Sequence, residues 1–161
     1  MAPSTWLQLV SAEEIHELRE NPTSINSLDK ADYYRTHFGA ALNYFLTGKA
    51  YPGPGDHELW AAVFGAEDIG CTTLENKAFA VVAPDQATEL AARLATVDVA
   101  AVETAVGQAD FDELVDEHEL YELELITPDE APGLILAEIE ELTALYATAA
   151  DSKLGVVMYT T

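Results

Sequence analysis

The chain has 161 residues, of which 49% are hydrophobic, and carries 29 acidic against 7 basic side chains, for a net charge of -22. This length fits one domain, residues 1 to 161, and the apolar content excludes an acidic disordered chain, which needs low hydrophobicity. The negative charge disfavours direct binding to nucleic acid or to an anionic membrane, because both would be repelled.

The first predicted elements are a strand and a capped helix. WLQLV, from Trp6 to Val10, contains aromatic and β-branched residues and predicts a short strand. Ser11 followed by Glu14 has the pattern of a capping box, in which each side chain accepts a hydrogen bond from a backbone N–H at the helix start. The helix should end before Pro22, because proline cannot continue it.

The stretch HFGAALNYFLTG, from His37 to Gly48, predicts part of a helix that begins earlier and ends at a left-handed glycine cap. An apolar face and a stripe beside it separate when residues are placed about 100° apart. The apolar face contains Tyr34, Phe38, Ala41, Leu42, Phe45 and Leu46, and the stripe contains Tyr33, His37, Ala40 and Tyr44. The stripe is either the wall of a ligand pocket, formed by Tyr33, His37 and Tyr44, or part of a helix buried on two sides.

The middle of the chain alternates loop, strand and helix signals. YPGPGD, from Tyr51 to Asp56, predicts a rigid loop, because its prolines fix φ and its glycines allow tight turns. A strand is predicted at Ala78 to Val82, and Pro84 suits the first position of the helix that follows. Asp98 has the side chain to cap a further helix, from Val99 to Val106.

Acidic residues crowd the segment from Asp110 to Glu124. They are Asp110, Asp112, Glu113, Asp116, Glu117, Glu119, Glu122 and Glu124. Apolar residues still recur among them, so the segment is amphipathic with one wet face. Its later part, LYELELI, alternates apolar and acidic residues and is compatible with either a helix or a strand.

A long helix and a closing strand complete the chain. Thr127 and Pro128 followed by two acids have the pattern of a helix start, and apolar residues then recur at helical spacing. VVMYT, from Val156 to Thr160, predicts a strand. The expected fold is α+β: a single domain with several helices packed over one face of a small mixed sheet, in which the N- and C-terminal strands lie side by side.

This order of elements resembles the YfbM-like proteins, a bacterial family of α+β single domains without a known function. The resemblance covers nearly the whole chain. It rests on the aromatic helix ending in LNYFLTG (Leu42 to Gly48), on VVAP before an alanine-rich helix, and on a long final helix that runs into a terminal strand. The resemblance implies an α+β fold and brings no catalytic residues with it.

The compartment is indicated by a single cysteine and by the absence of any long apolar segment. One cysteine, Cys71, cannot form an internal disulfide, which is typical of a reducing environment. The start of the chain, MAPSTWLQLV, lacks the basic and then apolar segments of a secretion signal. We therefore expect a soluble cytoplasmic protein.

Three His-Glu-Leu triplets, at His16, His57 and His118, invite comparison with zinc proteases. That chemistry needs a second histidine four residues further on, so that both imidazoles reach one ion. The residues found at those positions are Glu20, Ala61 and Glu122. The acidic segment also lacks the glycine of a calcium-binding loop, so we expect no metal and no other cofactor.

Charge is the strongest functional signal. Residues 98 to 151 hold 16 acids and neither lysine nor arginine, which suits either a basic partner or a high-salt environment. We predict a non-catalytic protein-binding module of the inhibitor or immunity type, which engages a basic protein such as a toxin or a nucleic-acid-binding enzyme. The predicted contacts are Asp110, Asp112, Glu113, Asp116, Glu117 and Glu119. The alternative is a small-ligand-binding protein or an enzyme that uses Tyr33, His37 and Tyr44.

Overall fold

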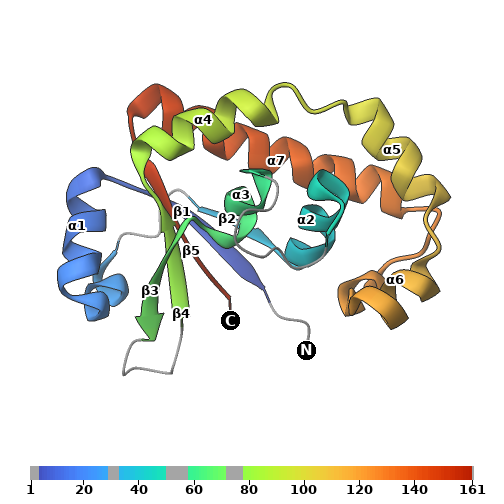
Figure 1. Cartoon of the computed structure of the whole chain (residues 1–161), viewed down its shortest axis with the longest axis horizontal. Coiled ribbons are helices and arrows are strands. Elements are labelled where there is room, and N and C mark those ends of the chain that lie inside the picture. The colour runs from blue at the N-terminus through green and yellow to red at the C-terminus, as the bar shows by residue number, and fades with distance from the viewer. Residues whose placement is uncertain (1–3, 29–32, 50–57, 72–77, 161) are drawn as a thin grey trace.

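A five-stranded sheet in the order β2-β1-β5-β4-β3 forms the centre of the computed structural model, which describes residues 4–28, 33–49, 58–71 and 78–160 (Figure 1). The strands are β1 (Thr5–Val10), β2 (Tyr33–Thr36), β3 (Glu67–Cys71), β4 (Ala78–Val82) and β5 (Gly155–Thr160). The strands nearest the two ends of the chain, β1 and β5, pair directly, which confirms their predicted place in the sheet.

Every pair of neighbouring strands is antiparallel, whereas we expected a mixed sheet. The connections explain this result. After β1, the chain returns through α1 (Ala12–Glu20) and η1 (Pro22–Ser27) to the same end of the sheet, so that Tyr33 of β2 pairs with Gln8 of β1. β5 then enters between β1 and β4 in the opposite direction to both.

Helices on one side of the sheet enclose the larger apolar core, and the later ones extend past the sheet (Figure 1). They are α2 (Gly39–Thr47), α3 (Ala61–Phe64), α4 (Pro84–Leu94), α5 (Val99–Gln108), α6 (Phe111–His118) and α7 (Ala131–Ser152). The long α7 packs against both α4 and α5. Its apolar residues at helical spacing, predicted to face the core, are all buried: Ile135, Ile139, Leu142, Tyr146 and Ala149.

The opposite face of the sheet is covered in part by α1 and η1, so the helices are not confined to one face as we expected. Ile15 and Leu18 of α1 pack there with Val10, Val81 and Val157 of three strands. The reason lies in β4 and β5, whose sequences AFAVV and GVVMYT are apolar on both faces and need cover on both sides.

Local signals for the ends of elements are confirmed. The Ser11 hydroxyl accepts a hydrogen bond from the Glu14 N–H at 3.1 Å, and the Glu14 carboxylate accepts one from the Ser11 N–H at 2.8 Å. The Asp98 carboxylate caps α5 through the Ala101 N–H at 3.1 Å. Gly48 ends α2 with φ 86°, in the left-handed region that favours glycine. The strand predicted at residues 78–82 has the same bounds in the structure.

The helix predicted to include Tyr33 is wrong at its start, because Tyr33–Thr36 is strand β2 and α2 begins only at Gly39. Residues 33 to 36 alternate between exposed and buried, which is the period of a strand. Their aromatic and β-branched side chains also favour a strand, and pairing with β1 supplies its hydrogen bonds. The Thr36 hydroxyl then accepts a hydrogen bond from the Phe38 N–H at 2.9 Å, where the chain turns into α2.

The segment LYELELI, which was compatible with a helix or a strand, contains the 3-10 helix η3 (Tyr121–Leu125). After it, Thr127 and Glu130 exchange the hydrogen bonds of a capping box, and α7 begins at the next residue, Ala131. The predicted loop from Tyr51 to Asp56 lies outside the described residues.

Candidate functional site

The acidic segment is divided by the structure into residues that cap helices and residues that face solvent. Asp110 is the N-cap of α6, where its carboxylate accepts a hydrogen bond from the Glu113 N–H at 3.2 Å. At the other end, Glu119 has φ 57° and the left-handed conformation that terminates the helix. Two of the predicted partner contacts, Asp110 and Glu119, therefore have backbone roles at the ends of α6.

A groove of about 270 Å³ lies between α6 and the η3 segment. We call it the α6–η3 groove; it is lined by Phe111, Asp112, Val115, Asp116, Leu123, Glu124, Ile126 and Pro128. Phe111 and Val115 are one turn apart on α6, so their side chains lie on one side of the helix. With Leu123 and Ile126 they give the groove an apolar floor.

Three carboxylates border this floor. Asp112 and Asp116 are one turn apart on α6, and Glu124 belongs to η3. Among the residues that the structure describes, the three side chains make no hydrogen bond and no ion pair. Glu113 and Glu117 are also exposed but do not line the groove. Of the six predicted contacts, Asp112 and Asp116 thus line the α6–η3 groove.

Glu122, two residues before Glu124, does not line the groove but caps a neighbouring helix. Its carboxylate accepts a hydrogen bond from the Ala41 N–H at 2.8 Å, in the first turn of α2. α2 has no capping side chain of its own at its N-cap, Phe38. A second contact joins the same two regions, since the rings of Tyr44 on α2 and His118 on α6 lie 5.3 Å apart. The acidic segment is therefore fixed to α2 by its own side chains.

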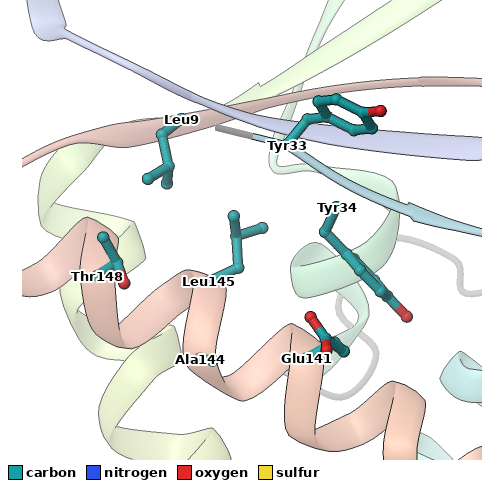
Figure 2. Close-up of a pocket in the computed structure, with 7 residues that line it drawn as sticks. All are labelled: Leu9, Tyr33, Tyr34, Glu141, Ala144, Leu145 and Thr148. Atoms are coloured by element: carbon teal, nitrogen blue, oxygen red, sulfur yellow. The ribbon is translucent and has the colours of Figure 1, made fainter. Parts of the chain in front are cut away.

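A second groove, also of about 270 Å³, lies between α7 and the edge of the sheet (Figure 2). We call it the α7–β2 groove; its lining residues are Leu9, Tyr33, Tyr34, Glu141, Ala144, Leu145 and Thr148. Figure 2 shows Tyr34 pointing from β2 toward α7, whereas the ring of Tyr33 lies on the other side of the strands. This difference follows from the alternation of side chains along a strand.

Tyr34 forms a fixed wall of the α7–β2 groove. Its side chain is buried, at 8% exposure, and its hydroxyl donates a hydrogen bond to the Glu138 carboxylate. Burial raises the pKa of Tyr34, and the hydrogen bond to Glu138 raises it further. The protonated phenol keeps its hydrogen bond to Glu138 even at alkaline pH, and this bond ties the ring to α7.

The predicted pocket of Tyr33, His37 and Tyr44 is not formed, because these residues do not share a helix. Tyr33 is half-exposed on β2 and its ring lies 5.0 Å from that of Trp6. His37 follows the strand, where its Nδ1 and the Ser4 hydroxyl share a hydrogen bond of 3.1 Å. Tyr44 alone is on α2, beside His118. Of the three, Tyr33 borders the α7–β2 groove.

Most residues that line the α7–β2 groove were not predicted from the sequence, because this groove forms between distant parts of the chain. Glu141, Leu145 and Thr148 lie at the spacing of one helix face, so the sequence carried a signal for their common side. Nothing in the sequence indicated that Leu9 and Tyr34 would lie opposite them. Glu124 was included in the acidic segment, but no pattern separated it from Glu122.

The structure gives two further results for the described part of the chain. No three His, Cys, Asp or Glu side chains there are grouped closely enough to hold a metal ion. In the same residues, no helix has both the length and the apolar character needed to cross a bilayer. His57, one of the three triplet histidines, is outside the described residues.

Known proteins share this fold. A family model described as a domain of unknown function, DUF1877, matches residues 4–159, and the chain belongs to this family. The chain is also similar to the crystal structure of a protein of unknown function, YfbM, from Escherichia coli. The TM-score is 0.73 at 17% identity, over 98% of this chain and 99% of that one, which shows a common fold. No curated protein matches the chain.

Proposed function

We propose that this protein is a non-catalytic binding module of the inhibitor or immunity type, and that its α6–η3 groove receives a basic segment of a partner protein. The observation that carries this proposal is the combination of an apolar floor with three carboxylates that have no partner among the described residues. The partner would be a cytoplasmic protein with a basic surface, such as a toxin or a nucleic-acid-binding enzyme.

The chemistry of the groove matches a lysine or arginine side chain. Such side chains combine an apolar stem with a charged end, and they bury the stem while the charge stays at the surface. Phe111, Val115 and Ile126 line the groove and would contact the stem, and Asp112, Asp116 and Glu124 would pair with the charge. A partner with several basic residues would also form ion pairs with the exposed Glu113 and Glu117.

The net charge supports the same proposal through the rate of encounter. A chain of net charge -22 attracts a basic protein over distances comparable to the Debye length, about 8 Å at physiological salt. Electrostatic complementarity raises the association rate and makes binding sensitive to salt. A high-salt environment would also favour an acidic surface, but it gives no reason for an apolar groove between the acids.

The test compares two variants that remove the same charge from the same helix. Asp112→Asn with Asp116→Asn alters the groove, and Glu113→Gln with Glu117→Gln serves as the matched control. Immobilised protein is incubated with lysate of its own host at low salt, and bound proteins are identified by mass spectrometry. We expect a basic protein that elutes as salt rises, and its affinity should fall about tenfold in the groove variant, or about 1.4 kcal/mol.

The control variant should lose less affinity than the groove variant, because its carboxylates lie outside the groove. If the two variants lose the same affinity, the loss comes from net charge alone, and the groove is not the contact. If no basic protein binds to the wild type at low salt, the proposed function is wrong.

A further inference from the structure

We propose a second binding site in this protein: the α7–β2 groove binds a small organic cation, a primary amine or guanidinium on a short apolar body. This site shares no lining residue with the α6–η3 groove, and the proposal does not depend on the function proposed above. It rests on the shape of the groove, its fixed aromatic wall and the position of one carboxylate.

The groove has an apolar centre. Leu9 from β1 and Leu145 from α7 approach it from opposite sides, and Ala144 adds a small side chain on the helix (Figure 2). Leu9 and Leu145 are only partly buried, so a ligand would remove more of their surface from water. A volume of about 270 Å³ has room for roughly nine water-sized groups, which is the size of a short amine.

The aromatic wall is preorganised. Because the Tyr34 hydroxyl is bonded to Glu138, its ring cannot swing into the groove and fill it. The hydrogen bond also occupies the carboxylate of Glu138, which is not among the lining residues. The part of the Tyr34 ring that lines the groove can attract cations as well as apolar groups.

The carboxylate of Glu141 would determine how a ligand is oriented in the groove. The Glu141 side chain is near the Tyr34 ring in Figure 2, and Thr148 lies at the other end of the same stretch of α7. Glu141 makes no hydrogen bond or ion pair within the described residues. A cationic group would meet Glu141 and the Tyr34 ring together, with its apolar body over Leu145 and Leu9. An anionic ligand would be repelled by Glu141 and by the charge of the whole protein.

The experiment uses three probes of one chain length that differ in charge: hexylamine, hexan-1-ol and hexanoate. Each is titrated at pH 7 into isotope-labelled protein, and amide shifts are followed by NMR. We expect saturable shifts at Leu9, Tyr34 and Leu145 with hexylamine, weaker binding of hexan-1-ol at the same residues, and no saturable binding of hexanoate.

Variants separate the site from general attraction of amines to an acidic protein. Glu141→Gln should weaken hexylamine binding about fivefold, the range of a partly exposed ion pair, and should leave hexan-1-ol binding unchanged. Glu140→Gln removes the same charge from the neighbouring exposed position, which does not line the groove, and should change neither. Leu145→Ala should weaken both hexylamine and hexan-1-ol.

Three results would overturn the proposal. One is the absence of saturable shifts with hexylamine in folded wild-type protein. Another is an equal loss of hexylamine affinity in Glu141→Gln and Glu140→Gln, which would indicate net charge alone. The third is saturable shifts confined to α6 and η3, because those would place the amine in the other groove.

Discussion

The body of the protein, formed by the sheet with α4 and α7, and its acidic end, formed by α6 and η3, are held together by different forces. α7 buries six residues along its 22, whereas α6 buries Leu114 alone. In the acidic end, the carboxylates of Asp110 and Glu122 accept hydrogen bonds from the backbone N–H groups of Glu113 and Ala41. Apolar burial therefore dominates the body, whereas the acidic end combines the buried Leu114, Leu120 and Leu123 with carboxylates that cap helices.

The largest change in the free energy of unfolding is expected from Gly65→Ala, in the body of the protein. Gly65 has φ 83°, and an added Cβ would lie 2.4 Å from the Cβ of Ala80 and 2.8 Å from the sulfur of Met158. We expect a loss of about 3 kcal/mol in the free energy of unfolding, measured by urea denaturation, because both overpacking and a strained backbone contribute.

The control for this change is Gly133→Ala, on the exposed side of α7, where an added Cβ meets nothing within 4 Å. It should stabilise the protein by about 0.5 kcal/mol, because alanine favours the helix. A Gly65→Ala variant as stable as the wild type would show that the contact between α3 and the sheet is looser than the structure has it.

A smaller loss is expected from Tyr146→Phe. Tyr146 is fully buried and its hydroxyl donates a hydrogen bond to the Ala62 carbonyl at 2.8 Å. Without the hydroxyl, this carbonyl loses its partner, which should cost about 1 to 2 kcal/mol at pH 7.

The same variant should change the alkaline stability. Burial raises the pKa of Tyr146 in the folded state above its ordinary value of 10.0. The stabilisation is complete below pH 10 and is lost at higher pH, because the unfolded chain ionises first. The wild type should therefore lose about 1.4 kcal/mol more per pH unit above pH 10 than Tyr146→Phe. Tyr121→Phe removes the hydroxyl of an exposed ring, and its free energy of unfolding should fall with pH as steeply as that of the wild type. If the free energy of unfolding of Tyr146→Phe also falls as steeply as that of the wild type, the prediction is wrong.

The smallest of these effects tests the acidic end. Glu122→Ala removes the carboxylate that caps α2 and should lower the free energy of unfolding by about 1 kcal/mol. Hydrogen exchange at the Ala41 amide should accelerate, because this N–H loses its acceptor. Glu124→Ala removes the same charge from a side chain without such a bond, and should leave stability unchanged or raise it by a few tenths of a kcal/mol. Equal losses in both variants would mean that the cap contributes nothing.

Features that depend on a few neighbouring residues were predictable from the sequence. Ser11 with Glu14, Asp98 and Gly48 act within one helical turn, and each has the role that its local pattern indicated. The strand at residues 78–82 and the buried face of α7 follow from continuous apolar runs and from helical spacing.

The remaining features depend on contacts between distant parts of the chain. Residues 33 to 36 fit a helical pattern when read together with the residues after them, although their side chains also favour a strand, and pairing with β1 decides between the two. Glu122 and Glu124 occupy similar sequence surroundings, and the position of α2 alone decides which of them caps a helix. The α7–β2 groove likewise exists because Leu9 lies opposite a helix that begins more than a hundred residues later.

The central place of β5 in the sheet has a consequence for synthesis on the ribosome. β1 with β2 and β3 with β4 can form hairpin-like pairs as the chain emerges, but the two pairs share no edge until β5 bridges them. The nascent protein would thus carry two half-sheets with unpaired strand edges until β5 is made. Such long-range closure favours slow folding, and chaperones that shield strand edges should matter most for this protein before β5 is available to pair.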